Sequence, residues 1–289
     1  MPIKASELIL NPDGSVYHLN LRPEHISNTI ITVGDPDRVE HVTKHFDSIE
    51  VKIRKREFHT QTGRYKGKRI SVISTGIGTD NIDIVFNELD ALVNIDLDKR
   101  VLKKELTSLD IIRIGTSGSI QKEIPIDSFL ASKYAVGFDS LLHFYKSSHV
   151  QHEAISKAIS EHTNWFKSKS EPYVVKSSDA LFNKMNSSIV YSGFTATNVG
   201  FYGPQGRVLR LPVQDAALND KLASFNYNGL TITNLEMETA GIYGLAALLN
   251  HNAISMNAII ANRATGEFSE NPKKSVNNLI IYTLDKLVL

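Results

Sequence analysis

The chain has 289 residues, of which 42% are hydrophobic and 22% are charged, a composition that excludes a mainly disordered protein. Its 32 Lys and Arg residues balance 31 Asp and Glu residues, and no apolar run approaches the ~20 residues that cross a bilayer, so we expect neither a nucleic-acid binder nor a membrane protein. The chain has no cysteine, which excludes disulfides, thiolate metal sites and cysteine nucleophiles and is typical of the cytoplasm, where we expect the protein to work.

The first half of the chain is predicted to alternate between short strands and helices. β-Branched runs predict strands at residues 29–33, 49–58, 69–74 and 110–114, with turns at Gly63 and Gly67. One helix is predicted from Pro36 towards His45, because proline suits the first helical turn, and a second over residues 80–93, where apolar residues recur at helical spacing. The charge-rich residues 94–108 are predicted to form a solvated helical insertion.

The second half continues the same alternation. Strands are predicted at residues 195–199, 230–234 and 253–262, and helices at residues 237–249 and 272–287. Strands that alternate with helices over the whole length predict one α/β domain, residues 1–289, in which helices flank a central sheet.

Familiar cofactor and hydrolase motifs are incomplete in this chain. The Gly76-Ile77-Gly78 sequence follows a predicted strand, but Asn81 stands where a dinucleotide fingerprint has its third glycine. Residues 115–119 resemble a nucleophile elbow, but the last position is Ser119 instead of glycine. The sequence therefore favours neither a dinucleotide enzyme nor a serine hydrolase.

Two loops that follow predicted strands combine small residues with an arginine. Gly34 and Arg38 come after the first strand, while Arg113 precedes the small residues 115–118. Glycine lets backbone amides approach an anion closely, and arginine adds a charge-assisted hydrogen bond. In an open α/β sheet such strand ends hold the ligand. The pair of loops favours a phosphate site, although each by itself is also typical of an ordinary turn or a surface ion pair.

A third candidate is the Glu236-Met237-Glu238 sequence, where a predicted strand gives way to a helix. Acidic residues in a first helical turn complement the helix dipole, which is the simpler interpretation. The alternative is that a carboxylate binds the vicinal hydroxyls of a sugar while the methionine packs against its ring.

Seven short motifs are spread over nearly the whole chain. They are VYHL (16–19), VGDPDRV (33–39), REF (56–58), STGIG (74–78), IRIGTSGSIQ (112–121), FYGPQGR (201–207) and LEMET (235–239). In this order they resemble the nucleoside phosphorylase family, most closely its uridine phosphorylase branch. The resemblance implies a single α/β domain with a mixed, partly barrel-like central sheet, and a homodimer or homohexamer whose active sites are shared between subunits.

The resemblance also implies an activity, the phosphorolysis of a pyrimidine ribonucleoside such as uridine, and a set of site residues. Phosphate would be held by Gly34, Arg38, Arg113 and Thr116, with Arg56 entering from the neighbouring subunit. Ribose would be held by Thr116, Met237 and Glu238, with His18 of the neighbour near the 5′-hydroxyl. The base would lie against Gly118, Phe201, Gln205, Arg207 and Glu236, the last of these as a support. The catalytic set would be Arg113, Gln205, Arg207 and Glu238.

This chemistry implies a nucleoside and phosphate as the only small-molecule partners, with phosphate as co-substrate and no metal or other cofactor. Some relatives hold a potassium ion between subunits with a Glu, a backbone carbonyl and a Ser. Here Glu57 matches that pattern, but Asn81 replaces the Ser, so we do not expect this metal site.

Other activities on the same fold remain alternatives. Purine nucleoside phosphorylases typically use an Asp after the late strand, and residues 259–263 contain none. A nucleosidase that uses water would have no need of Arg38, Arg56 and Arg113. A non-catalytic nucleoside-binding protein is expected to lack a phosphate arginine or the ribose carboxylate, and neither is lost.

Overall fold

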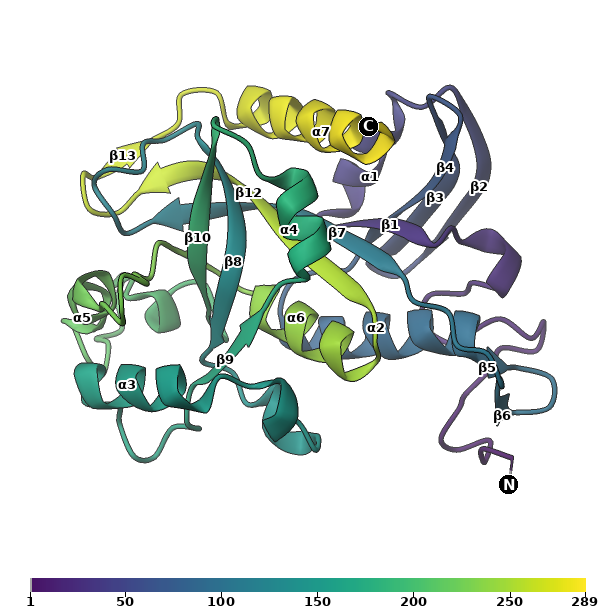
Figure 1. The fold of residues 1–289 in the computed structure, drawn as a ribbon, viewed down its shortest axis with the longest axis horizontal. Helices are drawn as coiled ribbons and strands as arrows, with labels where there is room; N and C mark the ends of the chain where they lie inside the picture. Colours follow the sequence, from purple (N-terminus) through teal and green to yellow (C-terminus); the bar gives the residue numbers. More distant parts are fainter. Residues whose placement is uncertain (1) are drawn as a thin grey trace.

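The computed structural model describes residues 2–289, and most strands join one eleven-stranded sheet (Figure 1). The strands are β1 (Thr29–Val33), β2 (Ser48–Lys55), β3 (Phe58–Tyr65), β4 (Lys68–Ser74), β5 (Ile95–Asp96), β6 (Val101–Leu102), β7 (Asp110–Ser119), β8 (Phe129–Gly137), β9 (Tyr173–Lys176), β10 (Val190–Thr197), β11 (Asn234–Glu236), β12 (Asn252–Asn262) and β13 (Glu267–Phe268). The helices are α1 (Pro36–Thr43), α2 (Thr79–Asn94), α3 (Glu153–Thr163), α4 (Asp179–Met185), α5 (Leu218–Ser224), α6 (Thr239–Leu248) and α7 (Pro272–Val288). Short 3₁₀ helices are η1 (Pro23–His25), η2 (Leu141–Phe144), η3 (Ser148–Val150) and η4 (Gly203–Gln205).

Part of the sheet closes on itself. The strand order is β13-β12-β8-β10-β11-β7-β1-β4-β3-β2, and β12 pairs with β7 as well as with β8. Strands β7, β12, β8, β10 and β11 therefore form a closed ring, from which β1, β4, β3 and β2 extend as an open sheet. This mixed, partly barrel-like sheet confirms the predicted fold class.

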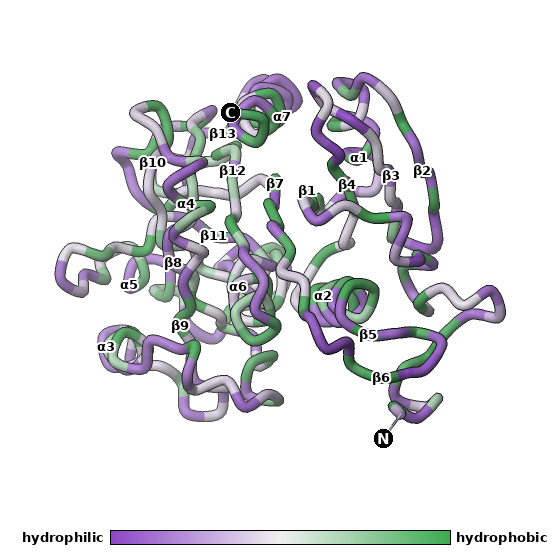
Figure 2. Tube along the Cα trace, turned by 45° about the vertical axis from the view of Figure 1, so that its right-hand side comes forward, coloured by the Kyte–Doolittle hydropathy of each residue, from purple (hydrophilic) through white to green (hydrophobic). Residues whose placement is uncertain are grey.

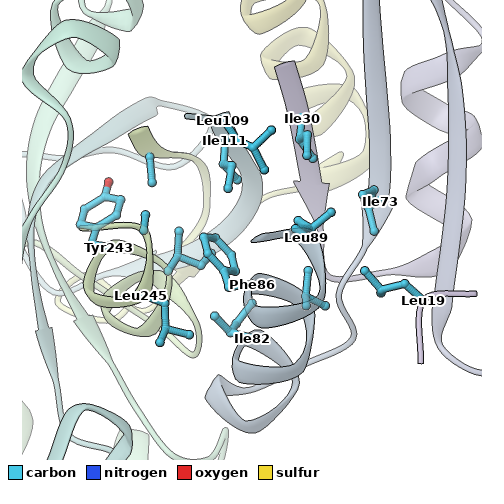
Figure 3. Packing of buried hydrophobic residues seen from close by; sticks show 14 of the residues in the cluster. Leu19, Ile30, Ile73, Ile82, Phe86, Leu89, Leu109, Ile111, Tyr243 and Leu245 are labelled. Carbon is cyan, nitrogen blue, oxygen red and sulfur yellow. The ribbon is translucent and has the colours of Figure 1, made fainter. Parts of the chain in front are cut away.

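Helices cover both faces of the central strands. Because successive strand residues point to opposite faces, Ile30 and Ile111 enter one core, and Ile31 and Ile112 enter another. The first core is built with α2 and α6, whose Phe86, Leu89 and Leu245 pack together in Figure 3. The second core includes residues of α1, α4 and α7. Burial on both sides explains why β1 is apolar or small along its whole length.

Several elements agree with the sequence predictions, while others differ for a physical reason. The strand at 29–33, the helix from Pro36 and the helices near 80–93 and 272–287 are confirmed. Gly63 does not form a turn: it lies inside β3, paired with Ile49 and Ile70. The strand predicted at 230–234 is instead β11, which begins at Asn234, because its pairing with β10 starts only there.

The prediction that residues 94–108 are helical is wrong. Residues 95–102 form a small β5–β6 hairpin in which Ile95 pairs with Leu102. The Asp96 carboxylate accepts a hydrogen bond from the backbone N–H of Lys99, a turn contact that competes with helix formation. The hairpin lies beside the N-terminal segment at the edge of the molecule (Figure 2), where Ile3 N–H donates to the Arg100 carbonyl.

Strand β7 is twice as long as predicted. The segment Gly115-Thr116-Ser117-Gly118, expected as a loop, continues the strand because β12 pairs with it from Asp110 to Ser119, with one register shift between Ile259 and Ala261. Within residues 2–289, no helix is long and apolar enough to cross a membrane.

Candidate active site

The side chain of Arg113 lies at the centre of a buried cluster of charges. It projects from β7, and its Nη2 lies 2.6 Å from Glu238 Oε2 and 3.1 Å from Glu236 Oε2. Its Nη1 donates to Asn257 Oδ1 at 3.0 Å, from the neighbouring strand β12. Burial alone disfavours the charged guanidinium, but the two carboxylates more than offset it, so the pKa of Arg113 lies above its ordinary value.

Gly115 gives this arginine its space. Residues 113 and 115 point to the same face of β7, and a Cβ atom on Gly115 would overlap the guanidinium of Arg113. The glycine in the middle of the strand is therefore explained by close approach and not by a turn.

Glu236 and Glu238 have different hydrogen-bond partners at the start of α6. Glu236 accepts hydrogen bonds from the backbone N–H groups of Glu238 and Thr239 at 3.0 Å, and from Thr197 Oγ1 at 2.6 Å. It thus binds the first open amides of α6 from the end of β11. The simpler interpretation is wrong in placing the acidic residues within the first helical turn, because α6 begins only at Thr239. Glu238 instead accepts from Arg113 and from the backbone N–H of Gly78 at 2.9 Å. Burial raises the pKa of Glu238, Arg113 opposes that shift, and the charge of Glu236 adds to it.

A second arginine stands next to this cluster. Arg38, on α1, directs Nη1 to the carbonyl of Ile114 at 3.5 Å. Burial and then the nearby charge of Arg113 lower the pKa of Arg38. Gly34 precedes this helix, and a Cβ on it would lie 3.5 Å from the Gly76 carbonyl oxygen. Thr116 follows on β7 and is half-buried, as is Met237 between the two carboxylates.

A separate loop brings together Phe201, Gln205 and Arg207. The Arg207 guanidinium lies 3.7 Å from the centroid of the Phe201 ring, and its Nη1 donates to Gln205 Oε1 at 2.6 Å. Burial and the neighbouring Arg263 lower the pKa of Arg207. Gln205 is buried and Phe201 is half exposed, so an amide and an aromatic ring form one edge of the site.

Arg263 and Asn219 hold this loop in place, and the sequence analysis gave neither a role. Both donate to the backbone carbonyl of Gln205, Arg263 Nη1 at 2.9 Å and Asn219 Nδ2 at 3.0 Å. The Arg263 side chain also passes Gly118, where a Cβ would lie 3.7 Å from Arg263 Cγ. Arg263 therefore links the end of β7 to the Gln205 loop. Only its position directly after a predicted strand could have indicated this role.

A cavity of about 860 Å³ lies against the same loop. Its lining includes Asp139, Asn198, Tyr202 and Arg207. Asn198 N–H donates to the Glu236 carbonyl at 2.9 Å, so the cavity borders the carboxylate cluster through that residue.

His18 and Arg56 form a third group. Each contacts Tyr17: the His18 ring meets it edge-on at 4.9 Å between centroids, and the Arg56 guanidinium lies 5.8 Å from its centroid. His18 is held by Glu88, nine residues after the first residue of α2, which is roughly 14 Å along the helix axis. Because the α2 N-terminus contacts Glu238, this distance separates His18 from the carboxylates of its own chain.

Arg56 occupies the turn between β2 and β3 with a positive φ of 55°. Within residues 2–289 the Arg56 guanidinium forms no ion pair. In particular, it makes no salt bridge to the adjacent carboxylate of Glu57. Among the same residues, no group of three or more His, Asp or Glu side chains is arranged to hold a metal ion.

Known proteins of similar sequence and structure share this architecture. The family model described as "Phosphorylase superfamily" matches residues 28–287. A uridine phosphorylase of Thermococcus kodakarensis is 30% identical over 91% of this chain and 83% of its own length. A DeoD-type purine nucleoside phosphorylase of Buchnera aphidicola is 29% identical over 94% of this chain and 97% of its own length.

Among solved structures, a Trypanosoma brucei nucleoside phosphorylase described as showing uridine phosphorylase activity superposes with a TM-score of 0.88. It is 28% identical to this protein, and the match covers 97% of this chain and 99% of that one. The ordered motifs, the closed five-stranded ring and these matches agree, and the chain belongs to the phosphorylase superfamily.

Proposed function

We propose that this protein is a uridine phosphorylase, a pentosyltransferase that converts uridine and phosphate into uracil and ribose 1-phosphate. The observation that carries the proposal is the cluster in which the half-buried Arg38 and the buried Arg113 stand beside Glu238. Two adjacent cations suit a dianion, and a carboxylate beside them suits the hydroxyls of a sugar.

The reaction breaks the bond between C1′ of ribose and the base nitrogen, while a phosphate oxygen forms a new bond to C1′. Arg38, Arg113, Gly34 and Thr116 would align the phosphate for this attack. Because positive charge develops on the ribosyl group, the phosphate dianion and Glu238 stabilise it electrostatically. Met237 would pack against the sugar, and no covalent enzyme intermediate is required.

The base leaves as a uracil anion whose charge spreads over its ring and carbonyl oxygens. Gln205 combines a donor and an acceptor in one amide, which suits the imide N–H and the adjacent carbonyl of uracil. Arg207 can stabilise the developing negative charge, and Phe201 and Gly118 would flank the ring. Since Glu236 is already occupied by backbone amides and Arg113, its part in this scheme is to support the cluster.

We further propose that the active site is completed by a second subunit. His18 and Arg56 share one surface around Tyr17, and His18 lies far along α2 from the carboxylates of its own chain. In a two-fold dimer this surface would supply Arg56 to the phosphate and His18 to the ribose 5′-hydroxyl of the neighbour. We expect the enzyme to act in the cytoplasm.

Turnover of uridine and inosine, each with and without phosphate, tests the assignment. Arg38→Ala should raise the KM for phosphate by about tenfold or more, because a charged hydrogen bond contributes roughly 1.5–3 kcal/mol. Arg64→Ala is the matched control, since that arginine pairs with Glu50 at the surface. Release of uracil at the same rate without phosphate would instead indicate a nucleosidase. Faster turnover of inosine than of uridine would indicate a purine nucleoside phosphorylase.

A further inference from the structure

The Glu88 carboxylate contacts three nitrogen atoms of the segment formed by His18 and Leu19. The backbone N–H of His18 lies 2.9 Å from Oε1 and that of Leu19 lies 2.8 Å from Oε2. The imidazole Nδ1 of His18 is 2.7 Å from Oε1. Glu88 therefore fixes both the main chain and the ring of residue 18 against α2.

These contacts decide which nitrogen of His18 carries the proton. An ionised carboxylate only accepts hydrogen bonds, so Nδ1 must be the donor, and in the neutral ring Nε2 then presents a lone pair. The edge-on contact with Tyr17 restrains the ring further. The His18 side chain remains 27% exposed, whereas that of Glu88 is 14% exposed. The segment thus offers an oriented hydrogen-bond acceptor at the surface.

We infer that Glu88 is a positioning residue that sets His18 Nε2 as the acceptor for the 5′-hydroxyl of a nucleoside in the neighbouring subunit. This inference rests on the proposed function and names a determinant of its substrate preference. A nucleoside with a 5′-hydroxyl can donate to Nε2, and a 5′-deoxynucleoside cannot. The charge of Glu88 also polarises the ring and makes Nε2 a better acceptor.

Glu88→Gln separates this role from a purely structural one. An amide oxygen at the place of Oε2 still accepts from the N–H groups of Leu19 and His18, the latter 3.1 Å away. The amide nitrogen then lies at the place of Oε1 and faces His18 Nδ1, so Nδ1 must become an acceptor. The substitution therefore moves the proton to Nε2. The N–H groups of Leu19 and His18 keep the oxygen at the place of Oε2 as acceptor, while the 2.9 Å contact of His18 N–H with Oε1 is lost.

Two measurements on the full-length protein are expected to change together. The ¹⁵N shifts of the His18 ring, identified by comparison with His18→Ala, should show protonated Nδ1 in the unmutated protein and protonated Nε2 in Glu88→Gln. The ratio of kcat/KM for uridine to that for 5′-deoxyuridine should fall about fivefold in Glu88→Gln, as for one ordinary hydrogen bond. Adding Glu88→Gln to His18→Ala should leave this ratio unchanged. Glu24→Gln, on the exposed η1, is the matched control.

An equal fall for both substrates would show that Glu88 only stabilises the segment, and the inference would be overturned. A protonated Nε2 in the unmutated protein would overturn it independently of any activity. Failure of the proposed function has a different signature, which is no phosphate-dependent turnover of uridine by the unmutated protein. If Glu88→Gln lowers the melting temperature strongly, Glu88→Asp with the same two substrates provides the comparison.

Discussion

Four charged side chains account for most of the electrostatics of the site. Arg38 and Arg113 bring two positive charges, and Glu236 and Glu238 bring two negative ones. Arg113 and both carboxylates are buried, and Arg38 is half-buried. Isolated buried ions are costly, so such charges persist because each has partners. Arg113 contacts both carboxylates. Among residues 2–289, Arg38 makes only one hydrogen bond through its side chain, a long one to the Ile114 carbonyl. Arg38 is therefore the cation best placed to bind an incoming anion.

Gly115→Ala tests whether the strand glycine serves the Arg113 side chain. The new methyl group would overlap the guanidinium, which must then rotate away from its carboxylates. We expect the KM for phosphate to rise by about tenfold, in line with the weakening of one charged hydrogen bond. Steady-state kinetics with varied phosphate measures the effect.

Gly118→Ala, on the same strand, is the control for this experiment. Its methyl group would meet Arg263 Cγ at 3.7 Å, an ordinary contact distance, on the side proposed for the base. The KM for uridine can therefore change in this variant, while the KM for phosphate should not. An unchanged phosphate KM in Gly115→Ala would show that Arg113 does not need this space.

At the scale of elements, the site depends on where strands end and helices begin. The first amides of α6 are bound by Glu236, and Gly78, which precedes α2, donates to Glu238. Helix N-termini favour negative charge, so the starts of both helices suit acidic side chains. On the other side of Glu236, the end of β8 is joined to β9 by Asp139, which accepts from Tyr173 Oη at 2.8 Å.

Asp139→Asn should change the pH dependence of the free energy of unfolding. Burial raises the pKa of Asp139, so the folded protein binds a proton on this carboxyl at a pH where the unfolded chain has lost it. The free energy of unfolding should therefore fall as pH rises from about 4 through the raised pKa, and then become level. The variant has no such group, so its stability relative to the unmutated protein should increase over the same window.

Urea unfolding of both proteins between about pH 4 and pH 7 measures this difference. The contributions of all other titratable groups cancel, because the two proteins share them. Tyr173 Oη and the backbone N–H of Leu141 both donate to Oδ1, and an amide oxygen can replace it. A difference in unfolding free energy that stays constant with pH would contradict the prediction.

At the scale of the whole molecule, the residues assigned to one reaction occupy two surfaces. The charged cluster and the Gln205 loop meet around β7, while His18 and Arg56 gather around Tyr17. A two-fold axis that places the second surface of one subunit over the first of another would complete both sites at once.

Subunit mixing tests this arrangement. Arg56→Ala and Arg38→Ala should each lower activity strongly, and a mixture after subunit exchange should recover activity. In a mixed two-fold dimer one site contains both intact arginines and the other contains neither, so the expected recovery is about a quarter of the unmutated level. Arg38→Ala is preferable to Arg113→Ala, because it leaves no buried carboxylate without its ion-pair partner.

Demonstrated exchange with no recovery would place Arg56 outside the shared site. Full activity of a subunit kept monomeric by dilution would contradict the shared site altogether.

The fold class, many element positions and the family could be predicted from the sequence alone. Apolar spacing located α2 and α7, Pro36 located the start of α1, and the ordered motifs identified the relatives. These features are local, because helix periodicity, turn chemistry and short motifs are each contained in a few neighbouring residues.

Contacts between residues far apart in the sequence could not be predicted in this way and were established by the folded structure. Pairing with β12 extended β7 through Gly115 and Gly118, although glycine and serine there are typical of a loop. Arg113 joins Glu238, 125 positions later, and Arg263 fixes the carbonyl of Gln205, 58 positions earlier. Such contacts depend on strand register and on the order in which strands close the ring, and no single segment contains that information. Sequence could therefore name the charged residues of the site, while the closed sheet determined which of them became partners.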